Sequence, residues 1–79
     1  MMTNNMLKSQ ILGVVDNQLA MNNPKCVKET LNRLKKLGYS EKEAKEMIAS
    51  VLLEEIYDLL KNHTIFNEKR YKERLNRLR

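Results

Sequence analysis

Three arginines near the end of the chain have a spacing that can bind phosphate groups along one helix face. Arg70, Arg74 and Arg77 repeat at i, i+4 and i+7 beside an apolar series that begins with Tyr71. Such a basic face can neutralise the phosphates of a nucleic acid or contact another anionic surface. Cations also suit the C-terminal end of any helix, where they form ordinary i, i+4 ion pairs. Because no glycine-rich phosphate loop or aromatic stacking platform accompanies the arginines, we favour a solvated face.

Six carboxylates gather within residues 41–61, where they could ligate a metal ion. They are Glu41, Glu43, Glu46, Glu54, Glu55 and Asp58. A metal ion would need further ligands from a second helix, for which Asp16 is the candidate. The helical Glu-x-x-His motif of di-metal bundles does not occur in the sequence. We therefore expect no metal ion and no cofactor, and we keep a degenerate metal-binding bundle as an alternative.

The single histidine and the single cysteine give no sign of catalysis. His63 falls in a connector, and no serine or cysteine lies at a spacing that would make it a nucleophile–base partner. One cysteine cannot form an internal disulfide, and one histidine cannot complete a Cys/His zinc site. We expect Cys26 to be a small core residue and His63 to be a surface or helix-cap residue. The sequence predicts a protein that is not an enzyme.

Two polar residues fall inside apolar helix faces, where their type conflicts with the local pattern. On a helical wheel, Glu55 lies within the main apolar arc of its helix, and Gln18 lies in the same way on the first helix. A buried carboxylate must be paired, hydrogen-bonded or protonated. We predict that the Gln18 amide donates to Glu55 and that Arg33 or Arg74 completes this polar cluster. An exposed edge and a ligand or metal role are the alternatives.

The composition limits which fold can position these residues. The chain has 79 residues, a formal net charge of +5, 42% hydrophobic and 32% charged residues, two glycines and one proline. This length allows one domain, residues 1–79, and excludes a Rossmann fold with a substrate domain, a barrel or a kinase lobe. The abundance of good helix formers and the few aromatic residues favour helix over strand. We predict an all-α protein.

Apolar periodicity and short breaks predict four helices, at about 5–21, 24–37, 41–61 and 68–78. Asn23 as the N-cap and Pro24 as the first helical residue would start the second helix. Gly38 would end the second helix. The segment Ser40–Glu43 predicts a capping box at the start of the third helix, and Asn67 would be the N-cap of the last helix. Short connections imply mostly antiparallel neighbours, so we predict a compact four-helix bundle.

The third helix carries more apolar surface than one packing face needs. Beside its main stripe, a second strip contains Leu53, Tyr57 and Leu60. The combined arc covers more than half of the helix, which suits a helix that is covered on several sides. Because a contiguous exposed apolar patch is unusual on a soluble monomer, we expect another helix or subunit to cover these residues. The sequence predicts self-association as a homo-oligomer or contact with another protein.

The sequence predicts no contact with a membrane. The longest apolar runs are three residues, whereas a membrane-spanning helix needs about 20. The first residues lack the basic and apolar regions of a secretory signal. Together with a lone thiol, this absence predicts a protein of the reducing cytoplasm.

Two longer patterns resemble known families. The pattern Leu34-x-x-Leu37-Gly38-Tyr39-Ser40-x-x-Glu43-Ala44-x-x-x-Ile48 is similar to the first-loop signature of ubiquitin-associated-type three-helix modules, which implies a ubiquitin-like partner. Roughly residues 14–78 look like a family of small, uncharacterised bacterial helical proteins. The segments that carry this second resemblance include Val15-x-Asn17-Gln18-Leu19, Glu29-Thr30-Leu31-x-Arg33-Leu34 and Val51-Leu52-x-Glu54-Glu55-Ile56. The second resemblance implies a bacterial helical protein and no assigned activity.

The sequence therefore favours a small cytoplasmic, all-α protein that acts through protein–protein contact or self-association. The first alternative is a nucleic-acid-binding accessory domain that uses the last helix. The second alternative is the degenerate metal-binding bundle.

Overall fold

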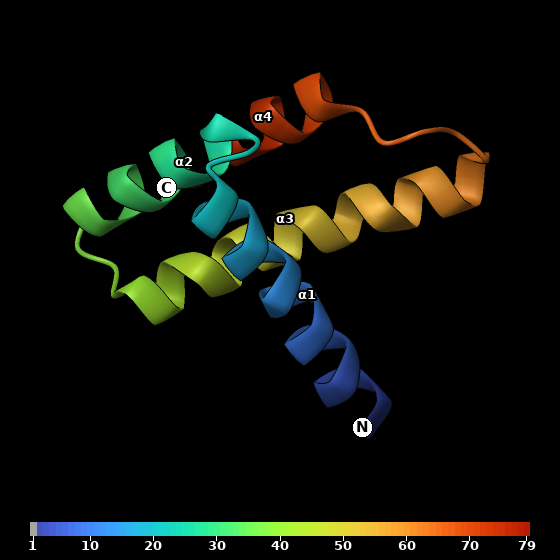
Figure 1. The fold of residues 1–79 in the computed structure, drawn as a ribbon, viewed down its shortest axis with the longest axis horizontal. Helices are drawn as coiled ribbons and strands as arrows, with labels where there is room; N and C mark the ends of the chain where they lie inside the picture. Colours follow the sequence, from blue (N-terminus) through green and yellow to red (C-terminus); the bar gives the residue numbers. More distant parts are fainter. Residues whose placement is uncertain (1) are drawn as a thin grey trace.

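Four α-helices account for nearly all of the described chain, and residues 2–79 contain no strand (Figure 1). The computed structural model describes the backbone of residues 2–79 and the side chains of residues 7–79. The helices are α1 (Met2–Met21), α2 (Lys25–Lys36), α3 (Glu41–Asn62) and α4 (Glu68–Asn76). The predicted all-α fold is confirmed, and each predicted helix matches an observed one to within a few residues at its ends.

The helix α3 is the element around which the others pack, since it contacts each of them. Both α2 and α4 run back along α3 in the opposite direction, whereas α1 crosses it steeply (Figure 1). The helices therefore form a compact bundle, with principal extents of 35 × 31 × 23 Å. The crossing of α1 means that this helix covers only part of the length of α3.

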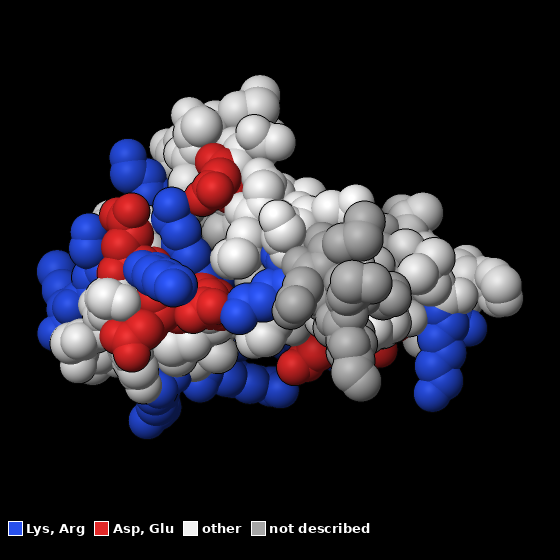
Figure 2. All heavy atoms as spheres, turned by 90° about the horizontal axis from the view of Figure 1, so that it is seen from below, with Lys and Arg blue, Asp and Glu red and all other residues white. Residues whose placement is uncertain are grey.

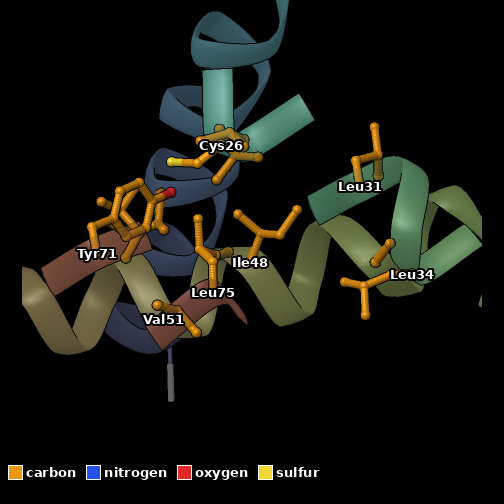
Figure 3. Packing of buried hydrophobic residues seen from close by; sticks show 13 residues of the cluster. Cys26, Leu31, Leu34, Ile48, Val51, Tyr71 and Leu75 are labelled. Atoms are coloured by element: carbon orange, nitrogen blue, oxygen red, sulfur yellow. The ribbon is translucent and has the colours of Figure 1, made fainter. Parts of the chain in front are cut away.

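The hydrophobic core lies where α1, α2 and α4 meet α3 (Figure 3). Its buried members are Ile11, Val15, Cys26, Val27, Leu31, Leu34, Ala44, Ile48, Ala49, Val51, Leu52, Tyr71 and Leu75. Cys26 is a core residue, as predicted, and its burial raises the pKa of its thiol. The short α4 supplies Tyr71 and Leu75, both fully buried, so it is an integral part of the core.

The connection from α2 to α3 contains Gly38, the residue that the sequence predicts at the end of the second helix. Gly38 has a φ of 107°, a conformation that side chains with a Cβ rarely adopt. The Gly38 N–H donates to the Lys35 carbonyl oxygen (3.0 Å), and the Tyr39 N–H donates to the Leu34 carbonyl oxygen (3.2 Å). This pair of bonds is the Schellman arrangement, which satisfies the last carbonyls of α2.

Both α3 and α4 begin at their predicted caps. The Ser40 N–H donates to Glu43 Oε1 (2.9 Å) while the Glu43 N–H donates to Ser40 Oγ (3.1 Å), so the capping box is complete. At α4, Asn67 Oδ1 accepts from the Arg70 N–H (3.0 Å). His63 ends α3 in the left-handed conformation, with a φ of 53°. The histidine is thus a helix cap, one of the two roles predicted for it.

The start of α2 differs from the prediction by one residue. Pro24 is the N-cap rather than the first helical residue, because its ψ of 150° lies outside the helical range. The helix begins at Lys25, and no side chain caps it. Asn23 therefore does not perform the capping role that we assigned to it. None of the helices α1 to α4, as the structure describes them, is both long enough and apolar enough to cross a membrane.

Replacing Ser40 with alanine tests the capping box. The variant Ser40→Ala should lower the free energy of unfolding by about 0.5–2 kcal/mol, because the Glu43 N–H loses its acceptor. Urea denaturation at one fixed protein concentration measures the change. Lys42→Ala is the control, since Lys42 is exposed in the same turn and outside the box. Equal midpoints for the two variants would show that the box contributes nothing.

Candidate functional site

A fully buried carboxylate lies between α3 and α4. Glu55 has no solvent exposure. Arg70 Nε donates to both of its oxygens, at 3.1 Å to Oε1 and 2.9 Å to Oε2. Arg74 Nε lies 3.2 Å from Oε1. Burying an isolated carboxylate is very costly, but two guanidinium partners with charge-assisted hydrogen bonds offset that cost. We call Glu55, Arg70 and Arg74 the Glu55 cluster.

Arg74 extends this cluster toward solvent. Its Nη2 donates to Asp58 Oδ2 at 2.6 Å, and its Nη1 lies 3.6 Å from Glu54 Oε2. The hydrogen bond with Asp58 raises the pKa of Arg74 above its ordinary value. One arginine of α4 therefore connects three carboxylates that α3 presents on one side. This network of ion pairs fixes the rotation of α4 relative to α3.

Gln18 does not make the contact that we predicted for it. Its Oε1 accepts a hydrogen bond from the Tyr71 hydroxyl at 3.1 Å, whereas arginines provide the partners of Glu55. Glu55 binds arginines and not the Gln18 amide, because a guanidinium binds an ionised carboxylate more strongly than a neutral amide does. Burial raises the pKa of Tyr71, and the nearby Cys26 and Glu55 raise it further. The tyrosine thus remains a proton donor that connects α4 to α1.

Arg33 is also placed differently from the prediction, which offered it as a partner of Glu55. Its Nη1 donates to the Leu78 carbonyl oxygen (2.6 Å), and its Nη2 donates to the Leu75 carbonyl oxygen (2.9 Å). Leu75 lies in the last turn of α4 and Leu78 just beyond it, at the end of the helix where carbonyl oxygens can accept further hydrogen bonds. Arg33 of α2 therefore caps the C-terminal end of α4, and of the two arginines proposed for Glu55, only Arg74 contacts it.

The three arginines predicted as a basic face do not act together. Arg70 and Arg74 turn toward Glu55, and Arg77 follows the last residue of α4 with its side chain exposed. Two of the three cations are thus committed to carboxylates of α3. The phosphate-binding stripe is broken, and α4 ends one residue before Arg77 instead of continuing to residue 78 as predicted.

The strip Leu53, Tyr57 and Leu60 lies on the opposite side of α3 from Glu55. Residues two positions apart on a helix differ by about 200° around its axis, so Tyr57 and Glu55 point in nearly opposite directions. Leu53 is half-buried, whereas 58% of Tyr57 and 64% of Leu60 is exposed to solvent. The expectation that another helix of the same chain covers Tyr57 and Leu60 is therefore wrong. We call these three residues the α3 stripe.

A groove of about 490 Å³ continues the α3 stripe toward α1. Leu7 and Ile11 of α1 line one side, and Ala49 and Leu53 of α3 line the other. An ion pair between Lys8 Nζ and Glu46 Oε2, 2.6 Å apart, joins the two helices beside the groove. The hydrogen bond from Lys8 lowers the pKa of Glu46. The groove is thus mostly apolar, with a charged pair among its lining residues.

Asp16 and Glu41, two of the carboxylates considered as metal ligands, form ion pairs with lysines. Asp16 Oδ1 lies 2.8 Å from Lys45 Nζ, and this hydrogen bond raises the pKa of Lys45. Among residues whose side chains the structure describes, no three His, Cys, Asp or Glu lie together as metal ligands would.

Comparisons with protein-family models, with curated proteins and with solved structures find no match for this chain. The resemblances stated above therefore stay predictions.

Removing the charge of Glu55 tests the cluster. Glu55→Gln should lower the free energy of unfolding by about 1–3 kcal/mol, because a buried, charge-assisted pair is replaced by a neutral amide that matches it poorly. Thermal or urea unfolding measures the change. Glu73→Gln, the same substitution at an exposed position on α4, should change stability by less than about 0.5 kcal/mol. Equal effects of the two substitutions would contradict a structural role for Glu55.

Proposed function

We propose that this protein acts by protein–protein contact through the α3 stripe and the adjacent groove, and not by catalysis. The observation that carries the proposal is the exposure of Tyr57 and Leu60 on a helix whose opposite side is buried in the core. Single exposed apolar residues are common, but here two large ones continue a half-buried leucine and an apolar groove. Such a surface gains free energy when a partner removes it from water.

The polar residues of the candidate site already bind partners within the chain, and this supports contact through an apolar surface. Arg70, Arg74, Arg33 and Gln18 each hold one helix against another, so their chemistry is used in folding. The nucleic-acid alternative depended on an uninterrupted arginine face, and two of its members bind Glu55 instead. Contact with another protein needs none of these side chains to be released. We keep the cytoplasm as the expected compartment, where the free thiol of Cys26 stays reduced.

Photo-crosslinking from the α3 stripe tests the proposal. A benzoylphenylalanine that replaces Tyr57 in the full chain should form one discrete adduct in cells, because the partner lies on this side chain. The adduct should disappear when Leu60→Glu is added, since a charge there opposes apolar contact. The same probe at Lys28, an exposed position on α2, is the control and should give no such adduct. No adduct from residue 57, or the same products from both positions, would contradict the proposal.

A further inference from the structure

We infer that the partner bound to the α3 stripe is a second copy of this chain, whose α3 lies antiparallel to the first across a two-fold axis near Tyr57. The inference rests on the proposed function and names its partner. Two features of α3 carry it: the spacing of the stripe and the charges beside the stripe.

The α3 stripe has the spacing of a helix that pairs with another helix. Leu53, Tyr57 and Leu60 are separated by four and three residues, and Ser50, which lines the groove, lies three residues before Leu53. This alternation keeps one seam facing a partner helix and lets side chains of each helix enter the spaces of the other. A two-fold interface uses the same patch on both subunits, so one seam is sufficient for a dimer.

Two opposite charges flank one side of the stripe. Glu54 follows Leu53 and Lys61 follows Leu60, so the carboxylate and the ammonium lie one above the other on the same flank. The Glu54 side chain is 65% exposed, with Arg74 Nη1 at 3.6 Å, and Lys61 is also exposed. When two such helices run antiparallel, Glu54 of each copy lies opposite Lys61 of the other.

A parallel pair would lack this complementarity. The other flank of the stripe carries Ala49 and Ile56, which pack with the core. In a parallel pair, the flank with Glu54 would face that uncharged flank of the second copy, and neither charge would find a partner. Charge complementarity therefore selects the antiparallel arrangement.

The groove and an exposed isoleucine border the two ends of the α3 stripe. The midpoint between Glu54 and Lys61 falls beside Tyr57. At the rise of an α-helix, Ser50 at the groove lies about 11 Å from that midpoint in one direction. Beyond Asn62 the chain leaves the helix and turns back toward α4 (Figure 1), and Ile65 lies in this connection. Ile65 is 87% exposed and adds an apolar side chain beyond the C-terminal end of the α3 stripe.

The distribution of charge on the surface agrees with this interface. Seen from below, charged side chains crowd the end of the molecule that holds α2 and the start of α3 (Figure 2). The opposite end, around the last turns of α3, is mostly uncharged in the same view (Figure 2). A second copy that docks over this end removes apolar surface and few unpaired charges from water.

Charge exchange at the two flanking positions tests the inference. Sedimentation equilibrium of the full chain should show a dimer with a dissociation constant in the micromolar range, since one helix face and one groove form a small interface. Glu54→Lys alone and Lys61→Glu alone should each weaken the dimer by about tenfold, because each places like charges opposite one another. The double variant should restore the affinity of the original chain, as should an equimolar mixture of the two single variants. Circular dichroism confirms that the exposed substitutions keep the helix content.

The outcomes separate this inference from the proposed function. A monomer at high micromolar concentration, or single variants that dimerise as well as the original chain, would overturn the second copy as the partner. If a residue-57 adduct to a different protein appears together with that monomer, the proposed function stands and the inference fails. If residue 57 forms no adduct at all, the proposed function fails first. Restored affinity in the mixture supports the antiparallel pairing directly.

Discussion

The buried carboxylate of Glu55 is the interaction on which the rest of the structure depends. With only nine residues, α4 is too short to be stable as an isolated helix. Its order comes from Tyr71 and Leu75 in the core and from two arginines that bind the same buried charge. An ion pair of this kind adds less net free energy than its contacts suggest, but removing one member leaves a costly unpaired charge. The pair therefore specifies where α4 lies more than it strengthens the fold.

Placing α4 on that side of α3 determines which side of α3 stays open. The helices α2 and α4 pack against the sides of α3 that carry the main core, and α1 crosses α3 once. The α3 stripe is left exposed to solvent. A third helix antiparallel to α3 would have covered that side. The exposed stripe thus follows from the arrangement of the fold rather than from an isolated surface residue, and this is why we interpret it as a binding surface.

Features that depend on local geometry could be predicted from the sequence, and features that depend on side-chain reach could not. The capping box and the role of Gly38 involve residues within a few positions of each other, so their spacing is sufficient. The burial of Glu55 could also be predicted, because the helical wheel places it among apolar residues. Its partner Arg70 was missed, since the sequence does not say how α4 is rotated relative to α3. The Tyr71 hydroxyl could have been foreseen as a partner for Gln18, because a buried tyrosine needs an acceptor.

The errors at Pro24 and Arg33 have similar causes. Proline fits both the N-cap and the first helical position, and only the backbone ψ of the folded chain decides between them. Arg33 is long enough to reach either a carboxylate or the carbonyls at the C-terminal end of α4, and in the folded chain the end of α4 lies within its reach. Both alternatives were compatible with the sequence, and packing between helices selected one.

The concentration dependence of backbone amide shifts in an NMR dilution series tests the central claim most directly. If α3 pairs with a second copy, dilution from high to low micromolar concentration should shift the amides of Leu53, Tyr57, Leu60 and Ile65 together with those that line the groove on α1. The amides of Arg70 and Arg74 should stay unchanged, because the Glu55 cluster is complete within one chain. Shifts that do not change with concentration, or changes centred on α2 and α4, would contradict the account.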